Sequence, residues 1–397
     1  MFDDVADAAD LFALQKYGTI YSRISNPTTA ALEERMASLE GGIGAVATAS
    51  GQAAEFLTAA ALAESGTNFV TSSALYGGTY TMFDTTLGRF GIDARFVEVM
   101  ILTPLPPRSM TTPGFSTRRY RNPSGAVADL AALADVAHAH YLPLVVDSTF
   151  ATPWLCRPME HGADIVVHSA TKFIGGHGTS IGGVIVESGR FDWGSGRFPQ
   201  MTEPNAGYNG LRFWENFGEF AFCTKLRAEQ LRDVGASLSP FNAFLLLQGL
   251  ETLPQRMTEH VANARTVAEF LDGHPAVSWV AWAGLADSPY RALADRYLPE
   301  GPGAVFTFGV SDRGEGGRAA GSAFIERLQL VSHLANVGDA RTLVIHPAST
   351  THQQLSDQAM VAGGLSPDMV RLSIGLEDVE DILWDLDQAL TGTGGAT

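Results

Sequence analysis

Short runs of apolar residues alternate along the first half of the chain with longer stretches in which apolar positions recur every three or four residues. This alternation is typical of strand and helix units on a mainly parallel sheet. It predicts an α/β protein. The expected strands are 45–48, 69–71, 142–147, 165–167 and 184–186, and the expected helices include 53–62, starting at Ser50-Gly51, and 127–140.

The pattern changes near residue 237. A long helical tract over 241–271 precedes apolar runs at 305–308, 343–345 and 370–372, and the last expected helix is 379–390. We therefore expect two domains, residues 1–235 and residues 236–397, with the boundary within about ten residues of 235.

The residues that follow the predicted strands are the first candidates for chemistry. In open parallel sheets the ligand crevice lies beyond the carboxyl ends of the strands. In this chain those positions are Ser50, Asp147 and the run Ser169-Ala170-Thr171-Lys172.

Charge and composition limit the kinds of partner. The 43 acidic and 26 basic side chains leave a net charge of −17, which repels nucleic acid and anionic membrane surfaces. The N-terminus lacks a secretory signal pattern and no apolar run is long enough to span a membrane, so a cytoplasmic protein with a small-molecule partner is expected. Cys156 and Cys223 are expected to be buried thiols, and no metal site is expected.

Lysine is scarce, and one lysine stands in an unusual context. The only lysines are Lys16, Lys172 and Lys225. Lys172 comes soon after a strand, with two hydroxyl residues before it and glycines after it. This arrangement suits an aldehyde cofactor with a phosphate, because the amine can form a Schiff base while hydroxyls bind phosphate oxygens. The alternative is a surface lysine in a glycine-rich turn. Lys225 is expected on an amphipathic helix with solvated charges.

Two further strand ends fit the same cofactor. Ser50-Gly51-Gln52 would offer the backbone N–H groups of a helix N-terminus to a phosphate, although such turns are mostly simple caps. Asp147 could keep a pyridinium nitrogen protonated, or could be an ordinary turn residue at a strand end.

The segment from Val99 to Arg121 differs from its surroundings. It contains four prolines, four arginines and no acidic residue, and it has neither helical nor strand periodicity. We expect it to be mostly loop. The two interpretations are a basic loop that contacts the substrate or another subunit and a poorly ordered insertion, and we favour the insertion.

Several motifs, in this order along the chain, resemble one family. They are Tyr21-Ser22-Arg23-Ile24-Ser25-Asn26-Pro27-Thr28, Ser50-Gly51-Gln52, Tyr76-Gly77-Gly78-Thr79, Asn122-Pro123-Ser124-Gly125, Asp147-Ser148-Thr149, Ser169-Ala170-Thr171-Lys172 and Arg371-Leu372-Ser373-Ile374-Gly375. Together they resemble the pyridoxal-phosphate (PLP)-dependent enzymes of cysteine and methionine metabolism. The C-terminal half, with 239–244 and 333–339, is most similar to the O-acetylhomoserine sulfhydrylases.

The resemblance implies a fold and a set of roles. The fold would be that of the aspartate aminotransferase-like PLP-dependent transferases (fold type I), with a smaller C-terminal α/β domain, assembled as a homodimer or homotetramer. The implied cofactor is pyridoxal 5′-phosphate. Lys172 would hold it and shuttle protons, Asp147 would pair with the ring nitrogen, and Tyr76 would stack on the ring. The phosphate would be bound by Ser50, Gly51, Gln52, Ser169 and Thr171, and by Tyr21 and Arg23 of a neighbouring subunit, while Arg371 and Asn122 would bind the substrate carboxylate.

The sequence departs from the family's pattern in a few places. Only 20 residues precede Tyr21, fewer than is usual, which would weaken assembly. Arg118 stands where relatives often carry glutamate, Ser148 where they carry asparagine, and Tyr141 where a glycine is common.

Three functions follow as hypotheses. The first is γ-replacement, in which O-acetyl-L-homoserine and sulfide give L-homocysteine and acetate. The second is a PLP-dependent lyase acting on methionine or cystathionine; Gly78 argues against methionine γ-lyase, in which a cysteine is usual at this place. The third is an inactive protein of the same fold.

Overall fold

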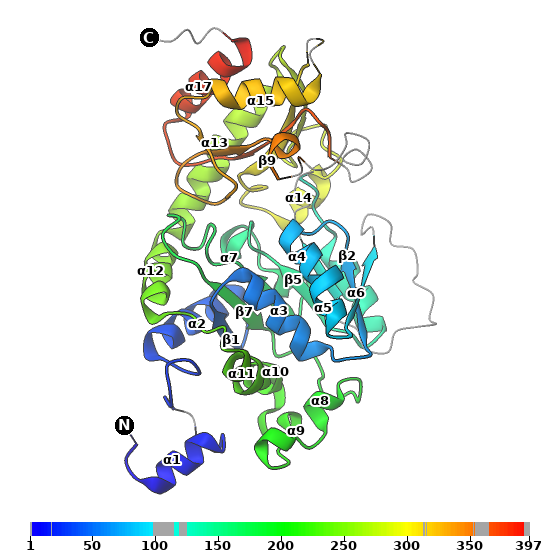
Figure 1. The fold of residues 1–397 in the computed structure, drawn as a ribbon, viewed down its shortest axis with the longest axis vertical. Coiled ribbons are helices and arrows are strands. Elements are labelled where there is room, and N and C mark those ends of the chain that lie inside the picture. Colours follow the sequence, from blue (N-terminus) through cyan, green and yellow to red (C-terminus); the bar gives the residue numbers. More distant parts are fainter. Residues whose placement is uncertain are drawn as a thin grey trace.

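A large, mainly parallel sheet forms the centre of the first half of the chain. The computed structural model describes residues 2–16, 18–97, 115–118 (backbone only), 125–312, 314, 316–351, 353 and 365–392. The strand order in this sheet is β1-β7-β6-β5-β4-β2-β3, and only the pairs that β7 forms with β1 and β6 are antiparallel (Figure 1). The strands are β1 (Gly44–Thr48), β2 (Asn68–Ser72), β3 (Asp93–Val97), β4 (Phe115–Arg118), β5 (Leu144–Asp147), β6 (Ile165–His168) and β7 (Gly183–Glu187).

Both faces of this sheet are covered, which explains why its strands are continuous apolar runs. Successive strand residues point to opposite faces. In β1, Ala45 and Ala47 accordingly belong to one buried cluster and Val46 to another. In β6, Val166 belongs to the first of these clusters and Ile165 to the second. A strand that is buried on both faces does not need polar positions. Helices α2 (Pro27–Glu40), α3 (Gly51–Leu62) and α6 (Leu130–Ala139) are among those that form these layers.

A second sheet lies in the C-terminal part. Its order is β10-β11-β12-β9-β8, and its strands are β8 (Val277–Ala281), β9 (Val305–Val310), β10 (Ser332–His333), β11 (Leu343–Ile345) and β12 (Met369–Ser373). It is accompanied by α14 (Arg291–Tyr297), α15 (Gly317–Arg327) and α17 (Val379–Thr391). One sheet therefore lies in each of the two expected parts of the chain, while the domain boundary at residue 235 stays a proposal.

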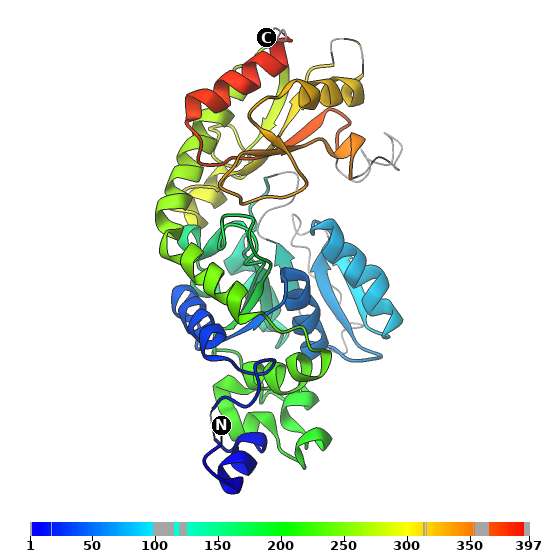
Figure 2. The same ribbon diagram turned by 60° about the vertical axis from the view of Figure 1, so that its left-hand side comes forward.

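Two consecutive helices connect the halves. The predicted tract 241–271 is divided at Thr252 into α12 (Pro240–Glu251) and α13 (Leu253–Asp272), with Pro254 in the first turn of α13. Proline is tolerated there because the first N–H groups of a helix have no partner within it. Figure 2 shows α12 and α13 along one side of the molecule, from the large-sheet half to the small-sheet half. One continuous buried cluster contains residues of both halves.

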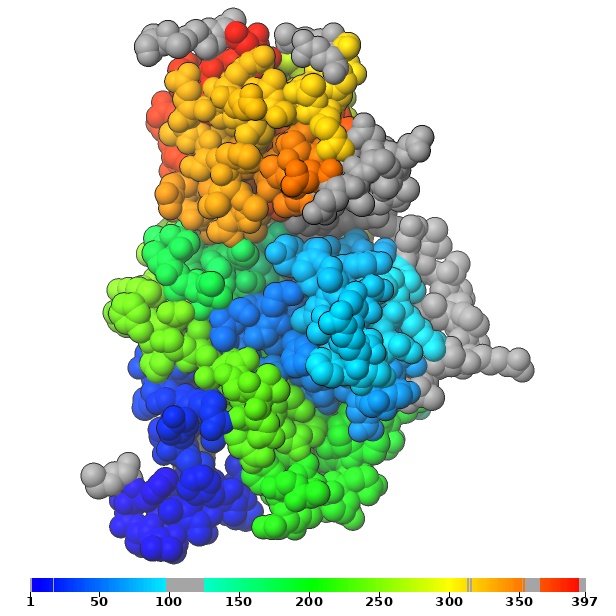
Figure 3. All heavy atoms as spheres, viewed as in Figure 1, coloured from blue at the N-terminus to red at the C-terminus, as the bar shows by residue number. Residues whose placement is uncertain are grey.

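The remaining helices are short or terminal. The N-terminal α1 (Val5–Phe12) projects from the body at the end opposite to α17 (Figure 3). Among the described residues, no helix has the length and apolar character needed to cross a membrane. The other α-helices are α4 (Gly77–Thr81), α5 (Leu87–Arg89), α7 (Thr152–Leu155), α8 (Pro199–Thr202), α9 (Phe213–Phe217), α10 (Ala221–Lys225) and α11 (Arg232–Val234).

One sequence expectation was wrong, and another is tested at only four residues. The segment 99–121 was expected to be mostly loop; its described residues, 115–118, form β4, which pairs in parallel with β5 and β2 in the interior of the sheet. The rest of the unusual segment lies outside the described residues. Lys225 is not solvated but buried, 5% exposed, with its ammonium paired to Glu229 and lying 5.2 Å from the ring centroid of Phe213. The i,i+4 spacing of this pair is local, but periodicity did not reveal its burial, because that depends on packing against other elements such as α9, which contributes Phe213.

Other expectations are confirmed. Cys156 and Cys223 are free, buried thiols. Tyr141, noted above as a departure from the resemblance, has a φ of 57°, which lies in the left-handed region that glycine adopts without strain.

Candidate active site

A cavity of about 250 Å³ opens at the carboxyl ends of the central strands. It gathers residues from both halves of the chain, because β5, β6 and α3 lie on one side of it and β12 with the loop before β11 on the other. Its lining residues are Gly51, Gln52, Glu55, Tyr76, Asp147, Thr149, Phe150, Val167, Ser169, Thr171, Lys172, Ile181, Ala335, Asn336, Val337 and Arg371.

Lys172 lies in the turn directly after β6. Its backbone N–H donates to the carbonyl of Ser169 at 3.1 Å, and its own carbonyl accepts from Gly176 at 2.8 Å. The side-chain amine donates to Oδ1 of Asn336, in the loop that follows β10. The turn therefore fixes the backbone of Lys172 while its amine lies inside the cavity beside the C-terminal half.

Asp147 ends β5 and is held by the next residues along the chain. Oδ1 of this buried side chain accepts from the backbone N–H of Thr149 at 3.0 Å and from the Thr149 hydroxyl. The same hydroxyl oxygen accepts from the backbone N–H of Ser169 at 2.8 Å. Thr149 thus joins the ends of two adjacent strands and fixes the carboxylate at the floor of the cavity.

The N-terminus of α3 forms one wall. The hydroxyl of Ser50 accepts from Ala53 N at 3.1 Å, which is the ordinary capping bond. A Cβ on Gly51 would lie 2.5 Å from the Cβ of Ser169, so only glycine allows this close approach of helix and turn. The amide groups of Gly51 and Gln52 come before the first intrahelical hydrogen bond and provide the positive end of the helix dipole.

Two polar side chains of the cavity, Gln52 in α3 and Thr171 in the lysine turn, already have hydrogen-bond partners. Oε1 of Gln52 accepts from the Thr79 hydroxyl at 2.8 Å, which ties α3 to the start of α4 and the neighbouring Tyr76. The Thr171 hydroxyl donates to Gly182 O at 3.2 Å and accepts from Gly182 N at 3.1 Å. Its single hydrogen therefore points to that carbonyl, and a phosphate contact would require the hydroxyl to rotate.

Tyr76 and Arg371 face the cavity from opposite halves. Tyr76 precedes α4, and its ring is 48% exposed. Arg371 is the middle residue of β12 and donates from Nη2 to the carbonyl of Asn336 at 3.2 Å. Burial lowers the pKa of Arg371 to about 10, while the nearby Tyr76 acts in the opposite direction. The guanidinium therefore stays charged at neutral pH, with further N–H donors available to a carboxylate.

The residues present fit a PLP-type cofactor in chemistry and in room. The cavity combines a primary amine, two buried carboxylates (Asp147 and Glu55), two aromatic side chains (Tyr76 and Phe150) and a helix N-terminus close to hydroxyl groups. These groups match an aldehyde, a ring nitrogen, a flat ring and a phosphate, in that order. Within the described part of the chain, no group of three or more metal-ligating side chains gathers.

Not every predicted residue lies here. Tyr21 is 62% exposed and is not among the residues that line this cavity. The guanidinium of Arg23 donates to the carbonyl of Arg232 and lies 5.5 Å from the ring centroid of Tyr21. Asn122 lies outside the described residues.

Asn336 and Thr149 are site residues to which the sequence reasoning gave no role. Both stood in motifs quoted for the family resemblance, Thr149 after Asp147 and Asn336 within 333–339. An Asp-Ser-Thr turn at a strand end was a usable signal, since an Asp side chain commonly accepts from the backbone N–H two residues later. Asn336 had no such local signal, because its partner Lys172 is distant in sequence.

Comparison with known proteins gives one family throughout. A sequence model described as Cys/Met metabolism PLP-dependent enzyme matches residues 1–391. Sulfhydrylase FUB7 of Fusarium oxysporum is 50% identical over 100% of this chain and 91% of its own length. The O-acetyl-L-homoserine sulfhydrylase of Leptospira meyeri is 48% identical over 98% of this chain and 90% of its own.

Solved structures agree. A Campylobacter jejuni protein described as an O-acetylhomoserine (thiol)-lyase, with N′-pyridoxyl-lysine-5′-monophosphate, superposes with a TM-score of 0.93 at 37% identity, covering 98% of this chain and 93% of its own. Cystathionine gamma synthase of Xanthomonas oryzae gives 0.80 at 32%, covering 98% and 90%. With a family match over nearly its whole length and relatives about half identical to it, the chain belongs to the PLP-dependent enzymes of Cys/Met metabolism.

Proposed function

We propose that this protein catalyses γ-replacement on O-acetyl-L-homoserine. The Cγ–O bond breaks and acetate leaves, a new Cγ–S bond forms with sulfide, and L-homocysteine results. The observation that carries the proposal is the cavity that brings the amine of Lys172 and the guanidinium of Arg371 together. An α-amino acid offers an amino group and a carboxylate to that pair, and similar proteins are named for O-acetylhomoserine sulfhydrylation.

Four residues of the cavity have the main tasks in this proposal. The cofactor, when bound, supplies an aldehyde carbon for the substrate's amino group and an electron sink for its Cα–H electrons. Lys172 holds the cofactor and then moves protons at Cα and Cβ. Asp147 pairs with the ring nitrogen and Tyr76 stacks on the ring, while Arg371 fixes the plane of the substrate carboxylate.

In this proposal Gly51, Gln52 and Ser169, at the start of α3 and of the lysine turn, would hold the cofactor's phosphate. Ser50 caps the helix and Thr171 contributes after its hydroxyl rotates. Asn122 belongs to the carboxylate site, as the family resemblance implies.

Assembly belongs to the same proposal. Neither Tyr21 nor Arg23 lines the cavity of its own chain, so we assign them to the phosphate of a neighbouring subunit, in a dimer or tetramer. We also propose a cytoplasmic location, since two buried free thiols are typical of a reducing compartment.

A lyase acting on cystathionine or methionine is the alternative outcome. A Cβ on Gly78 would lie 2.7 Å from the ring of Tyr76 and 3.2 Å from Nε2 of Gln52. A larger residue at 78 would therefore displace the tyrosine that we assign to the cofactor ring. The glycine thus matches the arrangement proposed here.

The experiment begins with cofactor attachment. Purified protein should show a visible imine band that borohydride abolishes, and peptide mapping should place the reduced label on Lys172. Lys172→Ala should lack the band, whereas Lys225→Arg is the matched control and should keep it. A label on Lys16 or Lys225 would contradict the assignment.

Substrate choice is then measured in a steady-state assay with sulfide. O-Acetylhomoserine, O-succinylhomoserine, cystathionine and methionine are compared by the appearance of homocysteine and of acetate or keto acid. O-Acetylhomoserine should be consumed with equal amounts of homocysteine and acetate formed. Keto acid from cystathionine or methionine as the main product would support the lyase instead.

A further inference from the structure

One face of α13 carries a row of buried polar side chains. Arg256, His260 and Asn263 are 6%, 0% and 4% exposed. Their spacing of four and then three residues places them on the same side of the helix. Buried polar groups are costly unless they are hydrogen-bonded, so the partners of this row indicate what it holds.

Arg256 holds the turn that bears the catalytic lysine. Its guanidinium donates to the carbonyls of Phe173 at 2.8 Å and Ile174 at 3.1 Å, the two residues after Lys172, and to Gly249 O at 2.8 Å. A Cβ on Gly176 would lie 2.1 Å from Nη1, so glycine leaves the room that the guanidinium occupies. Across the described residues Arg256 forms no salt bridge; its charge is directed to backbone carbonyls.

The other two side chains hold the segment after Arg371. Nδ1 of His260 donates to the carbonyl of Ile374 at 2.7 Å, because a carbonyl can only accept. Nδ2 of Asn263 donates to the carbonyls of Gly375 at 3.2 Å and Glu377 at 3.1 Å. The helix face that fixes the lysine turn therefore also fixes the exit of β12.

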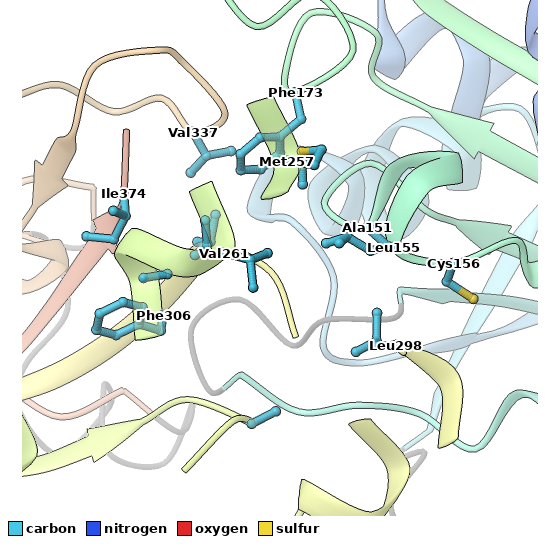
Figure 4. Packing of buried hydrophobic residues seen from close by; sticks show 14 of the residues in the cluster. Ala151, Leu155, Cys156, Phe173, Met257, Val261, Leu298, Phe306, Val337 and Ile374 are labelled. Atoms are coloured by element: carbon cyan, nitrogen blue, oxygen red, sulfur yellow. The ribbon is translucent and has the colours of Figure 1, made fainter. Parts of the chain in front are cut away.

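Direct packing closes the connection between the two segments. The rings of His260 and Phe173 meet edge to face, with centroids 5.2 Å apart at 86°. Figure 4 shows Phe173 beside Met257 and Val337. A Cβ on the adjacent Gly338 would lie 2.6 Å from the backbone N of Phe173, so this loop too lies close against the turn.

We propose that the row Arg256, His260 and Asn263 is a positioning element that sets where the carboxylate clamp Arg371 lies relative to Lys172. The inference rests on the proposed function only in taking an α-amino acid as the substrate. Such a substrate carries its amino and carboxylate groups on one carbon, so the two protein groups that receive them must be placed together. Productive sites hold such groups within about 0.5 Å. Lys172 and Arg371 belong to different sheets, and α13 provides the shared frame.

The test compares a ligand that needs both groups with one that needs only Lys172. Cofactor-loaded protein is titrated with L-homoserine, which has the α-carboxylate, and its reaction with hydroxylamine, which has none, is followed by stopped-flow absorbance. His260→Leu should weaken homoserine binding at least tenfold and change the hydroxylamine rate less than twofold. His260→Asn retains a donor at the Nδ1 place and should return homoserine binding to within threefold of the wild type.

Controls separate positioning from loss of structure. Glu259→Leu makes the same change at the exposed neighbouring position of α13 and should bind both ligands as the wild type does. Melting temperature and cofactor content are measured for every variant. If His260→Leu does not fold, Asn263→Ala removes the bonds to Gly375 and Glu377 and is tested in the same way.

A double-mutant cycle with Arg371→Lys tests whether His260 affects homoserine binding through Arg371. If His260 acts through Arg371, His260→Leu should change homoserine binding less than twofold in the Arg371→Lys background. The proposal would be overturned if the effects of His260→Leu and Arg371→Lys on homoserine binding multiplied in the double variant. It would also be overturned if His260→Leu reduced homoserine binding and the hydroxylamine rate by the same factor. The proposed function fails separately: wild-type protein would then bind homoserine normally yet form no homocysteine from O-acetylhomoserine and sulfide.

Discussion

Lowering the pH should destabilise this protein through the buried imidazole of His260. The ring has no exposed surface, and burial lowers its pKa to about 4, with the charge of Arg256 acting in the same direction. The hydrogen bond to Ile374 O and the carboxylate of Asp339 oppose this shift but do not offset it. In the unfolded chain a histidine titrates near 6.5.

The sign and size follow from these two values. The unfolded chain binds the proton at higher pH than the folded protein does, so the free energy of unfolding is fully retained above about pH 6.5 and falls as the pH decreases toward 4. With about 1.4 kcal/mol for each pKa unit, the complete loss is about 3 kcal/mol, of which about 2 kcal/mol is reached at pH 5.

The assay is urea unfolding of the cofactor-loaded protein at pH 8 and pH 5, for wild type and His260→Asn. The asparagine keeps a donor for Ile374 O but has no titration in this range, and every other titrating group is common to both proteins. Relative to the variant, the wild type should lose about 2 kcal/mol between the two pH values. His140→Asn, at an exposed histidine, controls for exchanging an imidazole for an amide and should follow the wild type. Parallel pH responses of wild type and His260→Asn would refute the reasoning.

Asp147→Ala should retain part of the cofactor but reduce turnover by orders of magnitude, because an unprotonated ring is a poorer electron sink; near-normal kcat with bound cofactor would contradict this role. Arg371→Lys should raise KM for O-acetylhomoserine and also lower kcat, since a point charge binds the carboxylate without fixing its plane; unchanged kinetics per loaded site would exclude the clamp. Asp385→Asn should lower the free energy of unfolding by roughly 3 kcal/mol in urea titrations, because the buried carboxylate accepts from the N–H groups of 329, 330 and 331 at 2.8 Å each, and an amide would turn a donor toward them. A loss below about 1 kcal/mol would show that these bonds matter little.

Local patterns were sufficient for most of the large sheet and for the position of the lysine. Apolar runs predicted β1, β5, β6 and β7 to within a few residues because both faces of these strands are buried. The scarcity of lysine and the hydroxyl residues at a strand end pointed to Lys172, and a carboxylate at the end of β5 pointed to Asp147. These signals are local: a strand end, a helix cap and a residue type lie within a few positions of one another.

Burial that depends on packing against other elements could not be predicted. The charged pattern around Lys225, with Glu229 one helical turn later, suggested a solvated pair, yet the lysine is buried and lies 5.2 Å from the ring centroid of Phe213 in α9. Proline, arginine and the lack of periodicity suggested a loop at 115–118, yet β2 and β5 provide the hydrogen-bonding edges between which those residues form a strand.

The sequence by itself therefore determined the fold class, most strands of the large sheet and the chemical identity of the central residues. Only the tertiary structure decided that Asn336 receives the amine of Lys172, that Thr149 joins two strand ends, and that α13 holds the segments after Lys172 and Arg371 together. The reason is physical: periodicity reports which face of an element is buried. It does not report which carbonyl or amine from a distant part of the chain that face will meet.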